Sequence, residues 1–287
     1  MIVTRFAPSP TGFLHIGHAY AALIAYRAAA ENRGRFLLRM EDIDLGRCRS
    51  EFEEAIYEDL RWLGIKWAEP VRRQSRHFDD YAVAIARLEK AELVYPCFCT
   101  RKEIEAEIAR ATDAPQSGEL AAAHYPGTCR SFTRAERAQR ITAGTPYALR
   151  LDHSKALASI ALQELGFDEL GHGPNGESGY QRARPEFMGD VVLARKDLPA
   201  SYHLAVVTDD ALQGVTLVTR GEDLFTATYI QRLLQALLGL PAPRYAHHRL
   251  ILDSSGRKFS KRDGAVALRS LRLSGATPGD VHRLAGL

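Results

Sequence analysis

The chain has 287 residues, 46% hydrophobic and 25% charged, a composition typical of a folded globular protein that excludes a mostly disordered chain. Its formal net charge of +3 permits a polyanionic partner without requiring one. No apolar run approaches the roughly 18–20 residues of a membrane span, and four cysteines do not make a disulfide scaffold. With no signal-peptide layout at the N-terminus, we expect a cytoplasmic protein of about two folding units that does not contact membranes.

The first third of the chain predicts strands that alternate with helices. Residues 2–7 and 35–40 are short apolar runs typical of buried strands, and the alanine-rich segment 18–32 favours a helix. Apolar residues then follow helical spacing over 52–63 and 78–88. This order is the rhythm of a parallel sheet with crossover helices, and so of an α/β fold.

The rhythm stops at Pro96. Residues 97–184 are polar and contain three of the four cysteines, and the glycine-rich part from 166 to 184 is predicted to be a loop. We therefore interpret the middle third as an insertion. Beyond it, we predict strands or buried segments, then a helix, then a final strand, in the order 190–194, 202–207, 215–219, 224–238 and 248–252.

The most informative segment follows the first predicted strand. The turn-forming run from Pro8 to Gly12 leads into a helix that begins near Gly17, and a helix N-terminus presents unpaired N–H groups that suit a phosphate. His15 and His18 lie three residues apart, so both can face one ligand there. Gly17 has no Cβ and lets a flat base or ribose lie against the backbone. The alternative is a turn with two solvated histidines.

A second basic segment lies near the other end of the chain. Residues 257–262 follow a predicted turn at 253–256 and are flanked by glycines, which allows the loop to move. Lys258 and Lys261 could approach the β- and γ-phosphates of a nucleotide and stabilise the charge on leaving pyrophosphate. Alone, the segment could equally be a solvated basic turn.

Together these segments resemble a known family. His15-Ile16-Gly17-His18 resembles the HIGH signature of class I aminoacyl-tRNA synthetases, and the run from Arg5 to Gly12 is similar to their glutamyl-specific branch. Lys258-Phe259-Ser260-Lys261-Arg262 resembles the KMSKS loop, although Phe259 and Arg262 depart from it. The resemblance implies ATP with Mg²⁺ as ligand and a set of residues around it: His15, Gly17, His18 and Lys261, with Lys258 assisting.

The resemblance also implies L-glutamate as substrate. A selective pocket for two carboxylates and one ammonium needs guanidinium groups and an acid, and ligands of such sheets bind beyond the carboxyl ends of strands. Glu41 and Arg220 each follow a predicted strand. The glutamate contacts implied by the family are Arg5, Phe6, Ala7, Pro8, Ser9, Glu41, Tyr202 and Arg220. Val206 stands where a glutamyl-tRNA synthetase is expected to have Asn, and this difference argues against a full-length glutamyl-tRNA synthetase.

Three clustered cysteines predict a metal site. Cys97, Cys99 and Cys129 offer soft thiolates suited to a structural Zn²⁺, which takes four ligands. The spacing leaves His124 and Tyr125 open as the fourth ligand, and the family resemblance favours Tyr125. The alternative is three free or buried cysteines; Cys48 is expected to be a lone residue.

The nearest resemblance is to the glutamyl-queuosine tRNA(Asp) synthetase family. Only 25 residues, 263–287, follow the lysine loop, too few for the anticodon-binding region of a full glutamyl-tRNA synthetase. The resemblance implies that glutamate is activated by ATP without tRNA and transferred to queuosine in the anticodon loop of tRNA(Asp). Two rivals remain: a truncated or discriminating glutamyl-tRNA synthetase that charges a tRNA 3′ end, and a non-catalytic paralogue that binds nucleotide or amino acid.

These inferences define the expected architecture. We expect an α/β fold with a Rossmann-like doubly wound parallel sheet, an inserted zinc-containing subdomain and a short helical C-terminal segment. The expected divisions are two catalytic halves at 1–96 and 185–240, the insertion at 97–184, and the lysine loop with its tail at 241–287. A monomer is expected. The arginine-rich stretch of the insertion, with Arg130, Arg134, Arg137 and Arg140, fits contacts to an RNA backbone or is simply solvated.

Overall fold

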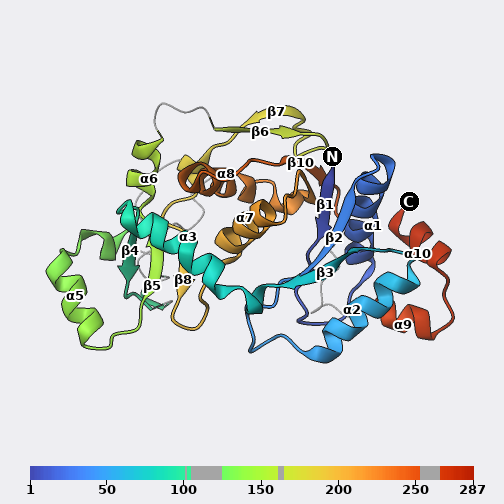
Figure 1. The fold of residues 1–287 in the computed structure, drawn as a ribbon, viewed down its shortest axis with the longest axis horizontal. Helices are drawn as coiled ribbons and strands as arrows, with labels where there is room; N and C mark the ends of the chain where they lie inside the picture. Colours follow the sequence, from blue (N-terminus) through green and yellow to red (C-terminus); the bar gives the residue numbers. More distant parts are fainter. Residues whose placement is uncertain (101, 105–124, 161–164, 253–265) are drawn as a thin grey trace.

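A computed structural model describes residues 1–100, 102–104, 125–160, 165–252 and 266–287 (Figure 1). Two sheets form its centre. The first has the order β1-β2-β3 and is parallel throughout: β1 (Val3–Phe6), β2 (Arg35–Met40) and β3 (Ala68–Arg73). The second has the order β7-β6-β10-β9 and is parallel except for the β6–β7 pair: β6 (Gly166–Glu169), β7 (Gly179–Arg182), β9 (Leu217–Gly221) and β10 (Arg244–His248).

The two sheets meet where β1 lies beside β9. The Thr216 N–H donates to the Val3 carbonyl oxygen at 3.0 Å, and Arg5 Nη1 donates to the Thr219 carbonyl oxygen at 3.3 Å. Both contacts step along the two strands in the same direction, so the parallel arrangement continues across the junction. From here the chain builds β2 and β3 on one side and β10 on the other, which makes the junction a topological switch point, where open α/β sheets bind ligands.

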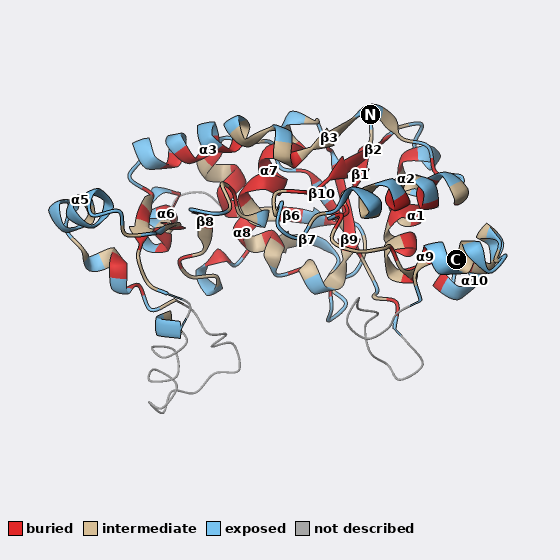
Figure 2. Cartoon of the chain, turned by 90° about the horizontal axis from the view of Figure 1, so that it is seen from below, coloured by how far each residue is buried: buried red, intermediate tan, exposed pale blue. Residues whose placement is uncertain are grey.

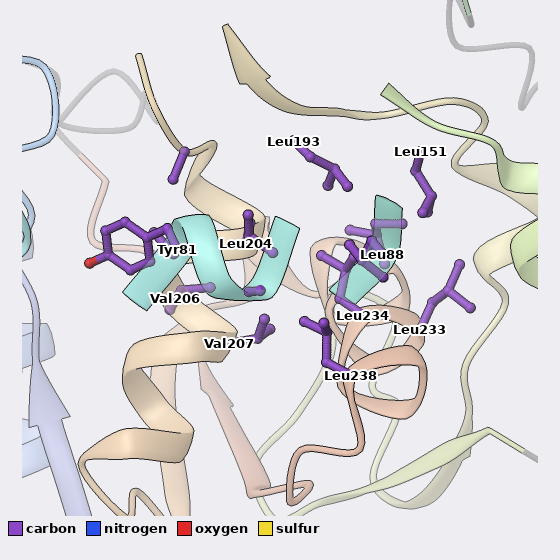
Figure 3. Close-up of a cluster of buried hydrophobic side chains, with 14 of the residues drawn as sticks. Tyr81, Leu88, Leu151, Leu193, Leu204, Val206, Val207, Leu233, Leu234 and Leu238 are labelled. Atoms are coloured by element: carbon purple, nitrogen blue, oxygen red, sulfur yellow. The ribbon is translucent and has the colours of Figure 1, made fainter. Parts of the chain in front are cut away.

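Helices cover both faces of the sheet. Phe36, Leu38 and Met40 of β2 join one buried cluster, whereas Leu37 joins another, because successive side chains of a strand point to opposite faces. The first cluster packs under α1 (Ile16–Glu31), α2 (Ser50–Trp62), α9 (Leu268–Leu273) and α10 (Pro278–Ala285). The second, part of which Figure 3 shows, packs under α3 (Phe78–Lys90), α7 (Tyr202–Leu212) and α8 (Ala227–Leu238). The predicted α/β fold with a parallel sheet is confirmed.

A third, antiparallel sheet stands at the far end of the molecule. Its order is β4-β5-β8, with β4 (Val94–Cys97), β5 (Ala148–Leu151) and β8 (Val192–Arg195). The helices α5 (Arg134–Thr142) and α6 (His153–Ser159) lie beside it (Figure 1). β4 and β8 flank the predicted insertion, and both pair with its strand β5. The bounds of the four predicted domain divisions stay predictions.

Buried residues concentrate in the central sheet and beneath its helices, whereas α5 has no buried residue (Figure 2). That helix begins with a capping box in which Thr133 and Glu136 satisfy each other's backbone N–H groups, so local bonds rather than core packing define it. Across the described parts of the chain, no helix is long and apolar enough to pass through a bilayer.

Three predicted elements differ from the structure. Residues 202–207 begin helix α7 instead of forming a strand, since a short apolar run does not distinguish a strand from a buried helix. The glycine-rich stretch 166–184 holds β6 and β7, which pair as a hairpin with Phe167 and Glu169 buried. The last strand is predicted over 248–252, but β10 spans Arg244–His248. In β10, the buried residues Tyr245 and His247 alternate with less buried ones.

Candidate active site

The helix entrance predicted from the two histidines forms the N-terminus of α1. His15 is its N-cap: His15 Nδ1 accepts the Gly17 N–H at 3.1 Å, and His18 Nδ1 accepts the His15 N–H at 3.2 Å. The two rings lie 3.8 Å apart between centroids. Because both Nδ1 atoms accept, the neutral rings carry their protons on Nε2. The capping box therefore fixes the orientation and tautomer of both histidines.

Gly17 makes room for this cap. A Cβ added there would lie 3.1 Å from Cε1 and 3.2 Å from Nδ1 of the His15 ring, closer than most side chains tolerate. The sequence predicts that Gly17 lets a ligand approach the backbone closely. The structure adds a second reason, because the missing Cβ leaves space for the imidazole of His15.

A hollow of about 220 Å³ opens at this helix entrance, and we call it the histidine hollow. His15, Gly17 and His18 line one side of it. The ends of β9 and β10 and the residues just after them line the other side, with Gly221, Asp223, His248 and Arg249. The hollow thus lies beyond the carboxyl ends of parallel strands on both sides of the switch point.

A second hollow, of about 350 Å³, lies beyond the carboxyl ends of β1, β2 and β3, and we call it the Glu41 hollow. Three of the predicted glutamate contacts line it: Ser9, Glu41 and Tyr202. Tyr202 is the first residue of α7, whose N-cap Ser201 accepts the Leu204 N–H at 3.4 Å and also lines the hollow. The Glu41 N–H donates to the Pro8 carbonyl oxygen at 3.0 Å, which holds the segments after β1 and β2 together.

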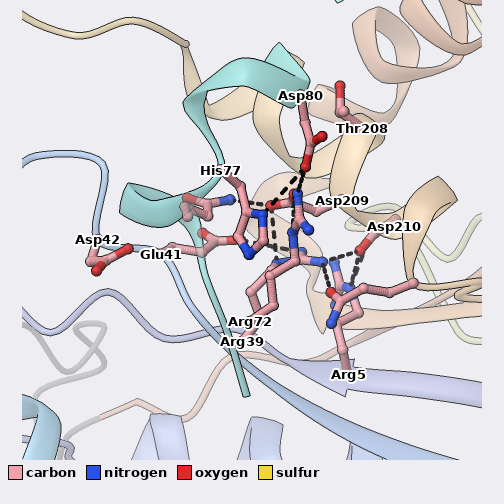
Figure 4. Close-up of polar contacts among 12 residues, drawn as sticks. Arg5, Arg39, Glu41, Asp42, Arg72, His77, Asp80, Thr208, Asp209 and Asp210 are labelled. Carbon is pink, nitrogen blue, oxygen red and sulfur yellow. Dashed lines mark hydrogen bonds and ion pairs between the residues drawn. The ribbon is translucent and has the colours of Figure 1, made fainter. Parts of the chain in front are cut away.

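A buried ion network supports the Glu41 hollow (Figure 4). Arg39, which has no exposed surface, donates from Nη1 to Asp210 Oδ1 at 2.7 Å and from Nη2 to Glu41 Oε1 at 3.4 Å. Arg5 donates from Nε to the same Asp210 oxygen at 3.1 Å. One carboxylate of α7 therefore connects β1 to β2 and, through Arg39, to the carboxylate that faces the hollow.

The neighbouring Asp209 anchors the other side of the network. It accepts hydrogen bonds from Arg72 Nε at 2.7 Å, Gln74 Nε2 at 2.7 Å and the Tyr81 hydroxyl at 3.0 Å. Burial raises the pKa of Tyr81, and the adjacent Asp209 carboxylate raises it further, so the phenol stays a hydrogen-bond donor. These hydrogen-bond donors come from β3, the turn after it and α3, and Arg39 Nε of β2 adds an ion pair with Asp209 Oδ2 at 3.7 Å.

The surroundings of Glu41 and Asp210 shift the pKa values of these two carboxylates in opposite directions. The pKa of Glu41 is raised because burial disfavours its charged form, and Arg39 and Arg5 offset this only in part. Burial also opposes the ionisation of Asp210, but Arg5 and Arg39 outweigh it and lower the pKa of Asp210. The lowered pKa favours the ionised form of Asp210, whereas the raised pKa favours the neutral form of Glu41.

Arg220 belongs to a separate buried chain of contacts. Its Nε donates to His247 Nε2 at 3.0 Å, and its two Nη atoms donate to Gln231 Oε1 at 2.7 Å and Thr228 Oγ1 at 2.6 Å. His247 Nδ1 in turn lies 2.5 Å from Glu169 Oε2. Among the described residues, the hydrogen-bond acceptors of Arg220 are all neutral side chains, and Arg220 is 6% exposed.

The remaining predicted glutamate contacts differ in their placement. Phe6 packs in the buried cluster under α1, on the face of β1 opposite to that of Arg5. Pro8 is buried and Ala7 partly buried in the segment that follows β1. Val206 lies one helical turn after Tyr202 and is 2% exposed. Lys258 and Lys261 lie outside the described residues, and so does His124.

The three predicted cysteine ligands are brought together. The Sγ atoms of Cys97, Cys99 and Cys129 lie within 4.8 Å of one another, and the Tyr125 hydroxyl lies 3.4 Å from Cys99 Sγ. Cys48 is not among them. Three thiols and a phenol that converge from β4 and the 3₁₀ helix Thr128–Ser131 form a donor set that fits Zn²⁺.

Sequence reasoning missed Arg39, Asp209 and Asp210. Arg39 occupies a strand position that reads as one polar residue in an apolar run. The signal for the two acids is their place one residue beyond the apolar run 204–207, which becomes informative once that run is recognised as part of a helix. The partners of these acids are three arginines, at positions 5, 39 and 72, which lie on strands of one sheet.

Comparison with known proteins identifies the family. Residues 1–278 match the family described as tRNA synthetases class I (E and Q), catalytic domain. The chain therefore belongs to this family of aminoacyl-tRNA synthetases, which are ligases, as the sequence motifs predicted.

Individual relatives refine this placement. The chain is 49% identical to the Glutamyl-Q tRNA(Asp) synthetase of Rhodobacter capsulatus over 100% of both chains, and 44% identical to that of Nocardia farcinica over 98% of this chain and 82% of the relative. It is 39% identical to the Glutamate–tRNA ligase of Aquifex aeolicus, over 96% of this chain and 55% of the relative. The resemblance to glutamyl-queuosine tRNA(Asp) synthetases is thus confirmed.

Solved structures of aminoacyl-tRNA synthetases share the fold of this chain. A glutamate tRNA ligase from Elizabethkingia meningosepticum, in complex with its amino acid, matches with a TM-score of 0.75 and 30% identity, over 92% of this chain and 52% of that one. The chain spans about half the length of the glutamate–tRNA ligases that it matches. A Mycobacterium tuberculosis methionyl-tRNA synthetase, at 14% identity and a TM-score of 0.60, shares the fold.

Proposed function

We propose that this enzyme activates L-glutamate with ATP to glutamyl-adenylate and then transfers the glutamate to queuosine in the anticodon loop of tRNA(Asp). The observation that carries the proposal is the pair of hollows beyond the carboxyl ends of one parallel sheet, one at the His15–His18 helix entrance and one beside Glu41 and Tyr202. The nucleic-acid specificity rests on the relatives named Glutamyl-Q tRNA(Asp) synthetase, one of which aligns over the whole chain.

Glutamate would occupy the Glu41 hollow. The Glu41 carboxylate would hold the substrate ammonium, and Tyr202 and Ser9 would provide hydroxyl groups around it. Arg5 and Arg220 would supply the positive charge for the two substrate carboxylates. Arg220 suits this role because its described acceptors are neutral and leave its charge uncompensated.

ATP would occupy the histidine hollow. The N-terminus of α1 and the Nε2–H groups of His15 and His18 would stabilise the phosphates, and Mg²⁺ would neutralise part of their charge. An oxygen of the glutamate α-carboxylate attacks the α-phosphorus, and the bond to pyrophosphate breaks. Lys258 and Lys261 would assist the departure of pyrophosphate, a role that rests on the sequence alone. Catalysis then consists mainly of positioning and electrostatic stabilisation.

A structural Zn²⁺ would be held by Cys97, Cys99 and Cys129. Tyr125 is our choice for the fourth ligand, because its hydroxyl lies 3.4 Å from Cys99 Sγ and accepts the Cys129 N–H at 2.8 Å. The metal would tie β4 to the 3₁₀ helix that follows and would not touch the reacting atoms.

Two measurements test the proposal. ATP–pyrophosphate exchange with glutamate and without tRNA is expected, and its absence would contradict activation and favour a non-catalytic paralogue. Transfer of labelled glutamate is expected to tRNA(Asp) that carries queuosine, and not to tRNA(Asp) without it. Removal of the 3′-terminal adenosine takes away the hydroxyl groups that a tRNA 3′-end ligase charges and leaves queuosine intact. The rival that charges a 3′ end therefore predicts loss of charging on tRNA that lacks this adenosine, whereas the proposal predicts that transfer to queuosine is retained.

A further inference from the structure

A third hollow, of about 320 Å³, lies at the end of the antiparallel sheet, and we call it the Tyr147 hollow. Leu149, Pro146 and Ala194 give it an apolar floor. Tyr147, which is 37% exposed, forms an aromatic wall, and the exposed cations Arg195 and Lys196 stand at its rim. None of the substrates assigned above occupies this hollow.

A row of stacked side chains holds the aromatic wall. The Tyr147 ring lies 5.8 Å from the Phe98 ring, and the Arg140 guanidinium lies over Phe98 at 5.6 Å and over Phe132 at 4.5 Å. Phe98 stands between two of the cysteines that converge on the predicted metal site. The cysteine cluster therefore holds Phe98 in place, while Tyr147, which contacts Phe98, remains accessible.

The Tyr147 hollow adjoins the proposed glutamate site. Ala194 and Arg195 of β8 line both the Glu41 hollow and the Tyr147 hollow. A polymer with one unit at the mouth of the Glu41 hollow can therefore place a neighbouring unit in the Tyr147 hollow, on the other side of β8.

The charges at the rim favour an anion. Lys196 makes no ion pair with any described residue, and the one ion pair that Arg195 makes with a described acid is with Asp197, at 3.7 Å and 77% exposed. An apolar floor, an accessible aromatic ring and two cations are the elements with which proteins bind single-stranded nucleic acid, by stacking on a base and neutralising its phosphate.

We propose that the Tyr147 hollow binds an unpaired base of the RNA next to the nucleotide that accepts glutamate, with Tyr147 stacked on the base and Lys196 and Arg195 on its phosphate. The proposal rests on the proposed function, in that an RNA loop must reach the Glu41 hollow. It adds a recognition site outside the reacting centre that would orient the loop for transfer.

The test uses the full-length chain and an anticodon stem–loop of tRNA(Asp) that carries queuosine, together with versions that have an abasic nucleotide on either side of queuosine. Tyr147→Ala is expected to raise the KM for the stem–loop about tenfold, the range of one base–aromatic stack, and to leave ATP–pyrophosphate exchange unchanged. Tyr147→Phe retains the ring and should behave as wild type. Lys196→Glu should weaken RNA use, whereas Lys66→Glu, an equal charge change at an exposed site near β3, should not.

A double-mutant cycle identifies the ligand. Tyr147→Ala should cost nothing further on the one abasic RNA whose missing base is the occupant, because both changes remove the same contact. Wild-type behaviour of Tyr147→Ala, or losses that multiply on both abasic RNAs, would overturn the proposal. Loss with Lys196→Glu alone would also overturn it, since the surface would then bind only a phosphate.

A second readout separates this proposal from the proposed function. Binding of the same RNAs, measured by fluorescence anisotropy without ATP or glutamate, responds to the Tyr147 hollow even where no glutamate is transferred. Failure of exchange or transfer in the wild-type chain contradicts the proposed function, whereas equal RNA affinities of wild type and Tyr147→Ala contradict the further inference. Equal unfolding midpoints of the two proteins are expected, because Tyr147 is partly exposed.

Discussion

At the N-terminus of α1, the identity of residue 17 is limited by the space that the His15 ring occupies. His15 caps its own helix through the Gly17 N–H, and its ring occupies the position next to which a Cβ of residue 17 would lie. The helix therefore depends on a glycine where helix propensity would favour nearly any other residue. Gly17 therefore lowers the stability of the helix but preserves the position of the His15 ring. Its effects on folding and on activity are opposite, and each can be measured separately.

We predict that Gly17→Ala lowers the rate of glutamate-dependent ATP–pyrophosphate exchange while the fold is kept. The new methyl group must displace the His15 ring by a few tenths of an ångström, because it would otherwise lie 3.1 Å from Cε1. Alanine is favoured over glycine in a helix by about 0.5–1 kcal/mol, so urea unfolding should show equal or greater stability. A variant with full exchange activity would contradict the role given to the ring position.

Glu41 is the titrating residue of its hollow. Its pKa is raised by burial, which Arg39 and Arg5 offset only in part, while the lowered pKa of Asp210 keeps that neighbour ionised. As the pH falls through the raised pKa, Glu41 becomes neutral and loses its attraction for an ammonium group. We predict that the KM for glutamate in the exchange reaction rises as the pH is lowered from about 8 to about 5, a range above the ordinary pKa of the substrate's side chain.

Glu41→Gln should have a high KM for glutamate at every pH. The sign of the stability effect provides a control. Because the folded pKa of Glu41 lies above its unfolded value, its contribution to the free energy of unfolding is largest at low pH and falls as the pH rises through the folded pKa. Weaker binding at low pH therefore does not reflect destabilisation by Glu41. A pH dependence that persists in Glu41→Gln would assign it to another group.

At the scale of elements, α7 connects the core to the site. Its side chains pack in the cluster with α3 and α8, its two acids bind the arginines of the first sheet, and its first residue, Tyr202, lines the Glu41 hollow. The position of Tyr202 thus depends on where the helix begins. Ser201 sets that beginning by accepting the Leu204 N–H.

We predict that Ser201→Ala destabilises the protein by about 1 kcal/mol and raises the KM for glutamate several-fold, whereas Ser201→Thr, which retains a capping hydroxyl, restores both. Thr133→Ala is the matched control, because Thr133 caps α5 in the same way, with the Glu136 N–H 3.2 Å away. It should cost similar stability and leave the KM unchanged. An equal rise in KM for both variants would show that the effect comes from stability alone.

The sequence predicted those elements that local chemistry determines. The helix entrance at His15 and the convergence of Cys97, Cys99 and Cys129 follow from short spacings, and the structure places both as expected. Contacts between distant segments were not predictable in this way. The bond between Arg39 and Asp210 joins residues 171 positions apart, and no local pattern indicates which arginine meets which acid. The helical start of α7 was missed for a related reason, since its apolar residues are buried on every side.

At the scale of the whole molecule, the antiparallel sheet links the cysteine cluster to the site. β4 ends at Cys97 and pairs with β5, and β5 pairs with β8. β8 then lines both the Glu41 hollow and the Tyr147 hollow. The histidine hollow and the Arg39 network, by contrast, are built from the parallel sheet and its helices. A change at the cluster should therefore affect the two reaction steps unequally.

We predict that the purified protein contains about one zinc ion per chain and that Cys129→Ser loses it. Without the metal, the segment that carries Phe98 and β4 is no longer tied to the 3₁₀ helix at residues 128–131, so the melting temperature should fall. Transfer to RNA should decrease more than ATP–pyrophosphate exchange, because the row of side chains that holds Tyr147 includes Phe98, which lies between Cys97 and Cys99. Metal analysis, thermal unfolding and the two activity assays measure these effects.

Cys48→Ser is the matched control for this substitution. Cys48 lies between β2 and α2 and takes no part in the cluster, so the variant should keep its zinc, its melting temperature and both activities. Equal metal loss in the two variants would place the ion elsewhere. Full zinc content in Cys129→Ser would remove that thiol from the ligand set, and equal losses of exchange and transfer would contradict the division of the molecule into an activating sheet and an RNA-facing sheet.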